Sequence, residues 1–205
     1  MKRVLLLIPK GAEVFETAAF IDVLGWADAE GTTPIEVVTA GLSPQVLCTF
    51  GLKIVPDRLI DEIDPSTFDA LAVPGGFEEH GYYEEAYSAA VGDLIGAFDD
   101  LERPIASICV GALPVAASGA LDGRCATTYH LDGNRHRRQL AEFGVAIVDR
   151  PIVRDGHVIT STAPATAIEV ALALLEDLTD RGNAERIRRL MGFGPTSDPE
   201  PPRTV

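Results

Sequence analysis

The stretch Ile105-Ala106-Ser107-Ile108-Cys109-Val110-Gly111 decides the fold of this chain. Its first four residues form a largely apolar run typical of a buried parallel strand, and a helix is predicted at residues 111–118. A cysteine between such a strand and helix occupies a sharp turn, where Gly111 relieves crowding as in a nucleophile elbow. These residues predict an α/β fold that raises Cys109 into a crevice, although a free cysteine is also commonly a small buried hydrophobe.

Strands and helices alternate on both sides of this stretch. Apolar runs predict further strands at residues 3–8, 35–39, 69–73 and 124–128, and hairpins within 46–55 and 145–160. Helical spacing predicts helices at about 16–29, 87–101, 135–143 and 184–191, and another from Pro164 onward. This alternation implies a doubly wound, mostly parallel sheet with helices on both faces. We expect one domain over residues 1–193 and a disordered, proline-rich tail over residues 194–205.

The composition limits the classes of partner. The 205 residues suffice for one domain with a full core, and a net charge of −14 disfavours a nucleic-acid partner. The run Arg135-His136-Arg137-Arg138 could attract an anion, but we interpret it as the solvated face of a helix. The apolar stretch at residues 4–8 is too short for a membrane span or a signal peptide, so we expect a cytoplasmic protein with no membrane partner.

The cysteines are three and widely separated, which argues against a disulfide framework and a structural zinc site. We expect Cys125 to be buried in its short strand, and we assign neither it nor Cys48 a catalytic role. We expect no metal and no other cofactor, because ligand spacing is absent. The histidines without such spacing are His80, His136 and His157.

Three predicted strand ends meet at one edge of the sheet, where the functional crevice of such folds lies. One strand end carries Cys109, and another carries the turn Pro74-Gly75-Gly76. The third leads to Glu16, at the start of the first helix. The helix after Cys109 favours its thiolate, which is the reactive form. A carboxyl group beside that thiolate has a raised pKa, so Glu16 would be protonated and act as hydrogen-bond donor or general acid. The plainer interpretations are a helix-capping glutamate and an ordinary tight turn.

Five motifs along the chain belong together. They are Lys10-Gly11-Ala12-Glu13-Val14-Phe15-Glu16-Thr17, Val55-Pro56-Asp57, Val73-Pro74-Gly75-Gly76, Ile108-Cys109-Val110-Gly111 and Ile159-Thr160-Ser161-Thr162-Ala163-Pro164-Ala165-Thr166-Ala167. Together they resemble the ThiJ/PfpI superfamily, the glutamine-amidotransferase-like group whose branches include the parkinsonism-associated redox protein. The resemblance covers the chain up to Phe193, in order and without large gaps. It implies a flavodoxin-like α/β fold and, in most members, a homodimer.

The resemblance also implies roles for particular residues. Cys109 is the nucleophile and Glu16 its protonated neighbour. Gly76 and Val110 offer their N–H groups to an oxyanion. Further candidates, for contact with the substrate, are Gly75, Tyr129 and Pro164.

Two positions depart from the family pattern. Val110 stands where peptidase-like members carry a histidine, so we predict no protease activity. Other members carry a histidine after a Thr-Thr pair, and here Thr127-Thr128 is followed by Tyr129 and then His130. On a strand, one residue decides which face a side chain takes. Either an irregularity brings His130 in as a proton shuttle, or Tyr129 lines the pocket and His130 is a surface histidine.

The resemblance implies a cysteine-dependent, cofactor-independent enzyme acting on small electrophiles by glyoxalase, hydrolase or hydratase chemistry. Dicarbonyls such as methylglyoxal are the candidate substrates. Cys109 would add to the aldehyde carbon, and Glu16, with His130 if it reaches, would move protons to yield a hydroxy acid. The alternative is a redox-responsive stress protein or chaperone, in which Glu16 stabilises an oxidised Cys109 without a dedicated substrate.

Overall fold

A seven-stranded sheet forms the centre of the molecule, and its strand order is β10-β11-β7-β6-β1-β2-β5. The computed structural model describes residues 1–194. All neighbouring strands in this sheet are parallel except β10 and β11, which form the expected hairpin. The strands of the sheet are β1 (Lys2–Leu7), β2 (Ile35–Gly41), β5 (Arg58–Leu59), β6 (Ala70–Val73), β7 (Ile105–Ser107), β10 (Ile152–Asp155) and β11 (Val158–Ser161).

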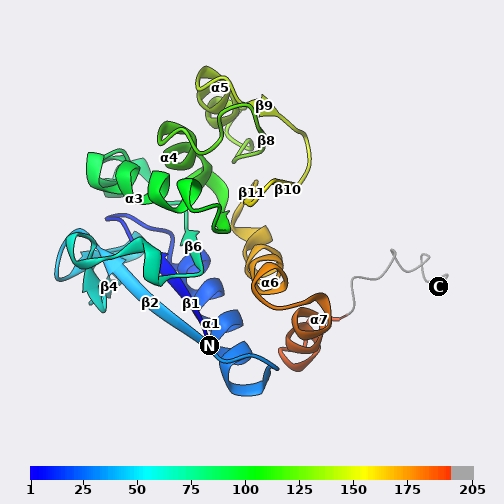
Figure 1. Ribbon diagram of the computed structural model, residues 1–205. Coiled ribbons are helices and arrows are strands. Elements are labelled where there is room, and N and C mark those ends of the chain that lie inside the picture. Colours follow the sequence, from blue (N-terminus) through cyan, green and yellow to red (C-terminus); the bar gives the residue numbers. More distant parts are fainter. Residues whose placement is uncertain (195–205) are drawn as a thin grey trace, which may run out of the picture.

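Helices cover both faces of this sheet (Figure 1). On one face α1 (Val14–Glu30) packs against α6 (Ala167–Leu178) and α7 (Arg181–Leu190). On the other face α3 (Ala89–Asp100) contacts β6, β7 and α4 (Ala112–Ala117), and α4 in turn contacts α5 (Arg135–Glu142). A short helix, α2 (Tyr82–Ala86), precedes α3. The predicted doubly wound, mostly parallel α/β fold is therefore confirmed.

The central strands are mostly apolar because both of their faces are covered. Every residue of β6 is buried, as are the last four of β1. Leu6 of β1 pairs with Thr39 of β2 on one side and with Ala72 of β6 on the other. The chain first builds outward from β1 to β2 and β5, and then returns to add β6 and β7 on the opposite side. This reversal between β1 and β6 is the topological switch point, where α/β sheets open a crevice beyond their strand ends.

Two helix boundaries differ from the sequence prediction. The helix expected at residues 87–101 is α3, which begins two residues later because Ser88 accepts a hydrogen bond from the Val91 N–H at 3.4 Å, and the separate helix α2 before it was not predicted. Similarly, Asp180 accepts from the Asn183 N–H at 2.9 Å, so α7 begins earlier than residue 184. The predicted disordered tail, apart from Gly194, lies outside the described residues.

Two small sheets lie outside the seven-stranded one. The antiparallel pair β3 (Val46–Leu47) and β4 (Lys53–Ile54) is the expected hairpin. The parallel pair is β8 (Cys125–Ala126) and β9 (Ala146–Ile147). The expectation that Cys125 is buried is wrong, because side chains alternate along a strand and Ala126 takes the inward position, leaving the cysteine exposed.

Candidate functional site

Cys109 occupies a strained turn between β7 and α4. Its φ angle is +56°, in the left-handed region that residues other than glycine rarely adopt. Gly111 permits this turn because a Cβ atom at that position would lie 2.6 Å from the carbonyl oxygen of Val73. The predicted sharp turn is confirmed, and strain of this kind persists only where the surrounding structure fixes it.

Glu16 lies in the first turn of α1 and is completely buried. Its Oε2 atom accepts a hydrogen bond from the Gly75 N–H at 2.6 Å, whereas its Oε1 atom is buried without a partner. Burial is the largest influence on this carboxyl group and raises its pKa to about 8, although the Gly75 N–H acts in the opposite direction. Glu16 is therefore mostly protonated at neutral pH, in the direction the sequence predicted.

Cys109 does not have the lowered pKa that the sequence predicted. Burial raises the pKa of its thiol well above the ordinary value, and the charge of ionised Glu16 acts in the same direction. The Val110 N–H, which donates to the sulfur, lowers this pKa by a smaller amount. The sequence argument relied on a helix dipole, but α4 is only six residues long and desolvation outweighs it. Glu16 and Cys109 titrate as a pair, in which the form that has lost one proton can carry the charge on either group.

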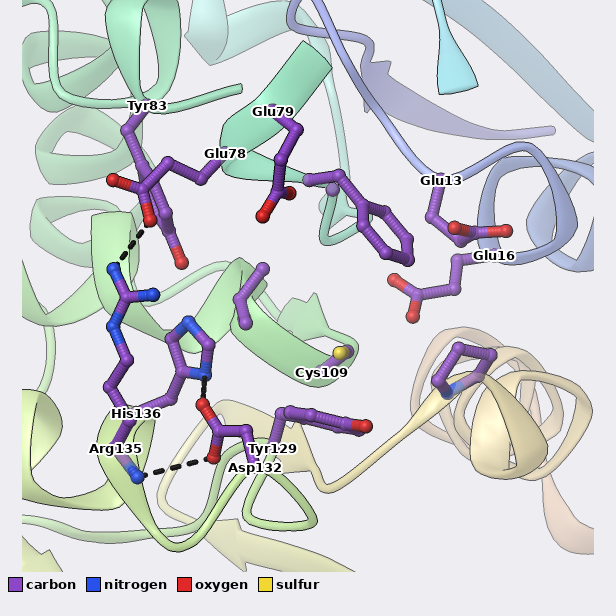
Figure 2. A pocket seen from close by; sticks show the side chains of 14 residues that line it. Glu13, Glu16, Glu78, Glu79, Tyr83, Cys109, Tyr129, Asp132, Arg135 and His136 are labelled. Carbon is purple, nitrogen blue, oxygen red and sulfur yellow. Dashed lines mark hydrogen bonds and ion pairs between the residues drawn. The ribbon is translucent and has the colours of Figure 1, made fainter. Parts of the chain in front are cut away.

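A cavity of about 290 Å³ opens over this pair (Figure 2). Its volume is at the lower end of the range for small-molecule sites. It brings together six of the residues that the sequence singled out, which are Cys109, Glu16, Gly76, Val110, Tyr129 and Pro164. They come from the first turn of α1, from the segments that follow β6 and β7, and from those before α5 and α6, so the cavity lies at the strand-end crevice.

Two of the expected site residues do not line this cavity. Gly75 is outside the lining, and its N–H already donates to the Glu16 carboxyl group, so it supports Glu16 and is not a substrate contact. His130 lies close enough to Asp149 to affect its pKa, and the neighbouring Tyr129 takes the inward position. Tyr129 therefore stands where the resemblance placed a histidine, and His130 does not line the cavity.

The N–H groups of Gly76 and Val110 come from two segments, the turn that follows β6 and the residue directly after Cys109. At the isolated bridge between Ala12 and Gly76, the backbone hydrogen bonds run from Glu13 to Gly75 and from Phe77 to Gly11. This pattern leaves the Gly76 N–H outside the pairing. A Cβ atom at Gly76 would lie 2.2 Å from the Tyr82 ring, so only glycine fits at this close approach.

The other eight residues that line the cavity are ones that sequence reasoning missed. Phe77, Glu78 and Glu79 could have been found from their position directly after the Pro-Gly-Gly turn. Asp132 and His136 could have been found from the four-residue spacing between them. The run interpreted as a solvated helix face in fact contributes two of its members, Arg135 and His136, to the cavity wall. The missed residues are Glu13, Phe77, Glu78, Glu79, Tyr83, Asp132, Arg135 and His136.

Ion pairs hold several of these lining residues in place. Arg135 pairs with Glu78, and its backbone N–H donates to Asp132 Oδ1 at 3.1 Å. Asp132 Oδ2 lies 2.7 Å from His136 Nδ1. Burial lowers the pKa of His136 more than Asp132 raises it, which favours the neutral imidazole.

Residues 1–194 contain no cluster of three or more side chains suited to holding a metal ion. Among the helices of the same residues, none combines the length and apolarity needed to cross a membrane.

The fold and the pairing of Cys109 with Glu16 place the chain in the class of α/β proteins that carry a cysteine at a strand-to-helix turn. The model of the DJ-1/PfpI family matches residues 2–177, and the chain belongs to this family. The resemblance seen in its sequence motifs is thereby confirmed.

Three relatives illustrate the similarity. Protein dj-1beta of Drosophila melanogaster is 30% identical over 190 residues, which cover 92% of this chain and 95% of the relative. Its crystal structure matches with a TM-score of 0.82 at 29% identity, covering 95% of this chain and 99% of that one. The glutathione-independent glyoxalase DJR-1.2 of Caenorhabditis elegans is 30% identical over 178 residues, covering 86% and 89% of the two chains. The isonitrile hydratase of Pseudomonas putida is 26% identical over 188 residues, covering 90% and 78%.

Proposed function

We propose that this protein is a cofactor-independent enzyme that converts small dicarbonyls, such as methylglyoxal, into hydroxy acids. The observation that carries the proposal is the buried, protonated Glu16 beside the strained Cys109 at the base of a cavity of about 290 Å³. The family relative named as a glutathione-independent glyoxalase supports the same chemistry.

In the first step, the Cys109 sulfur adds to the aldehyde carbon. The carbon–sulfur bond forms as the carbonyl π bond breaks, and the thiol proton passes through Glu16 to the carbonyl oxygen. A side chain that holds a proton at neutral pH beside the nucleophile suits this transfer. The product is a hemithioacetal, and the N–H groups of Gly76 and Val110 would stabilise charge on its oxygen.

In the later steps, the adduct isomerises. The proton on the former aldehyde carbon is removed and one is returned to the neighbouring carbonyl carbon, so the first carbon is oxidised and the second reduced. This gives a thioester of the hydroxy acid. Water then cleaves the thioester, which releases the acid and restores the thiol without an external oxidant or reductant.

The test is hydroxy-acid formation from methylglyoxal by the full chain without glutathione. We expect Cys109→Ser to abolish turnover, and Glu16→Gln to lower kcat by about 10²-fold or more, since it removes a general acid–base group. Cys125→Ser is the matched control because Cys125 is exposed and lies outside the cavity. Absence of product with the wild type, or equal loss in the Cys125 variant, would contradict the proposal.

A second candidate function is oxidation sensing at Cys109. It is favoured by Glu16 Oε1, which is buried without a partner and would, when protonated, donate to an oxygen on the oxidised sulfur. Under this alternative, Glu16→Gln changes how far hydrogen peroxide oxidises Cys109, measured by intact mass, while methylglyoxal turnover stays unchanged. A large loss of turnover in the same variant argues for the enzyme.

We further propose that the protein forms a homodimer, as its resemblance to the family implies. The β3–β4 hairpin carries exposed apolar side chains that a second copy would cover, namely Leu47, Phe50 and Leu52. Light scattering coupled to size-exclusion chromatography should give twice the 21.8 kDa chain mass, and Phe50→Asp should shift it toward the monomer. A monomeric wild type would rule the dimer out.

A further inference from the structure

A buried histidine faces the site from the wall that α5 contributes. His136 lines the same cavity as Cys109, and its side chain is only 13% exposed. Its ring lies between two aromatic side chains, with centroid distances of 6.0 Å to Tyr129 and 6.5 Å to Tyr83. The position after the Thr-Thr pair holds Tyr129, so the cavity obtains its imidazole from a different element.

Asp132 fixes the orientation of this imidazole. Its Oδ2 atom lies 2.7 Å from His136 Nδ1, four residues further along the chain, and Figure 2 shows the contact. The contact is an ion-pair distance without hydrogen-bond geometry, and a carboxylate this close favours the tautomer that carries the ring proton on Nδ1 and leaves Nε2 as the basic nitrogen. The Asp132 carboxyl is itself held by the Arg135 N–H at 3.1 Å. An imidazole oriented by a carboxylate in this way is the arrangement of a general base.

We propose that His136, oriented by Asp132, is the proton-transfer residue that isomerises the Cys109 adduct. This inference rests on the proposed function. A substrate bound to Cys109 occupies the same cavity of about 290 Å³ that the His136 ring lines. His136 takes the proton from the carbon that carries the sulfur and returns it to the neighbouring carbon. Glu16, on the opposite wall, transfers protons to and from the oxygen atoms of the adduct. The two acid–base groups therefore act on different atoms of the same intermediate.

The charge state of His136 suits this role. Burial lowers its pKa, so the ring is mostly neutral and able to accept a proton near pH 7. Among the surrounding charges, Asp132 and Glu78 raise this pKa and Arg135, which is paired with Glu78, lowers it. The titratable and charged groups that face the ring are Asp132, Arg135, Glu78, Tyr83 and Tyr129.

The experiment compares adduct formation with turnover, using methylglyoxal and the full chain. Intact mass after brief exposure reports the adduct on Cys109, and hydroxy acid reports turnover. We expect His136→Ala to form the adduct but to lose kcat by about 10²–10⁴-fold, and added imidazole to restore part of it. Asp132→Asn, which changes a positioning residue, should lower kcat less and move the acidic limb of the kcat–pH profile.

His130 supplies the matched control, because it lies in the same segment but outside the cavity. His130→Ala should retain wild-type turnover. Normal turnover by His136→Ala, or a loss that imidazole does not restore in a variant with wild-type circular dichroism, overturns the inference. If His136→Ala fails to fold, His136→Gln is measured instead. Normal turnover by His136→Gln overturns the inference, and imidazole is not added to this variant. A wild type that forms neither adduct nor product overturns the proposed function itself.

Discussion

Cys109 keeps a backbone conformation that its own side chain opposes, with φ at +56°. The left-handed conformation costs an L-residue roughly 1–2 kcal/mol, and glycine avoids this cost. We therefore expect Cys109→Gly to be more stable than Cys109→Ala by about 1 kcal/mol, although both variants lack the thiol. Urea denaturation of the two variants measures the difference, and an alanine variant of equal or greater stability would show that the turn is not strained.

Glu16 makes the stability of the fold depend on pH. Its pKa is about 8 in the folded protein, against an ordinary value of 4.5, so the folded state holds a proton that the unfolded state releases. This stabilisation is fully present below about pH 4.5 and is lost as pH rises through about 8. Each pKa unit corresponds to about 1.4 kcal/mol, so the effect amounts to several kcal/mol.

We expect the free energy of unfolding of the wild type to fall over this window and that of Glu16→Gln to change less. Denaturant titrations at pH 5, 6.5 and 8 measure the two slopes. Glu13→Gln is a suitable comparison, because burial also raises the pKa of Glu13 but that carboxyl is less deeply buried. Parallel slopes for the wild type and Glu16→Gln would mean that Glu16 is not a protonated buried acid.

At the residue scale, the sequence predicted the position of Cys109 and the protonation of Glu16, because short motifs place both at strand ends. It did not predict the raised pKa of the thiol, which depends on how deeply the turn is buried. Nor did it predict that His136 lines the cavity. That residue follows a loop whose path is determined by contacts distant in sequence, and its run of basic neighbours is typical of a solvated helix.

At the scale of elements, two glycines allow the strand-end turn to be tested separately from helix propensity. A Cβ atom at Gly111 would meet the Val73 carbonyl oxygen at 2.6 Å, whereas one at Gly96 in α3 would meet nothing within 4 Å. We expect Gly111→Ala to lower the free energy of unfolding by about 1–3 kcal/mol. Gly96→Ala should raise it by up to about 1 kcal/mol. Thermal unfolding of both variants checks this, and a neutral Gly111→Ala would show that the backbone moves aside.

The elements themselves were largely predictable, because β1, β6 and β7 are apolar runs ended by glycine or proline turns. The separation of β8 and β9 into a small sheet of their own was not. Each has only two paired residues, so their pairing depends on the path of α5 between them. The wrong expectation for Cys125 follows from the same cause, since the inward face of β8 cannot be identified until its partner is known.

For the whole molecule, the net charge of −14 combines with an acidic cavity rim that includes Glu79 and Asp132. We expect kcat/KM to be higher for the neutral methylglyoxal than for 4,5-dioxovalerate, an α-oxoaldehyde that carries a negative charge away from its reacting carbons. The ratio should fall as salt rises, because the Debye length shortens from about 30 Å at 0.01 M to about 3 Å at 1 M. Steady-state kinetics at several ionic strengths measure it, with Glu79→Gln expected to weaken the dependence. A ratio that does not change with salt would exclude charge as the cause.

The hydrogen bond between Gly75 and Glu16 joins residues that are 59 positions apart, and the strand that leads to Cys109 comes later still. Parallel pairing over such separations is slow, because the intervening chain must lose its freedom before any contact forms. During synthesis, Glu16 and the first strand emerge well before the sulfur does. A nascent or partly folded chain therefore carries a solvated thiol with ordinary chemistry, and the special environment of Cys109 arises only when folding is nearly complete. Cellular electrophiles and oxidants therefore encounter a solvated Cys109 thiol in the partly folded chain and a buried one in the folded protein.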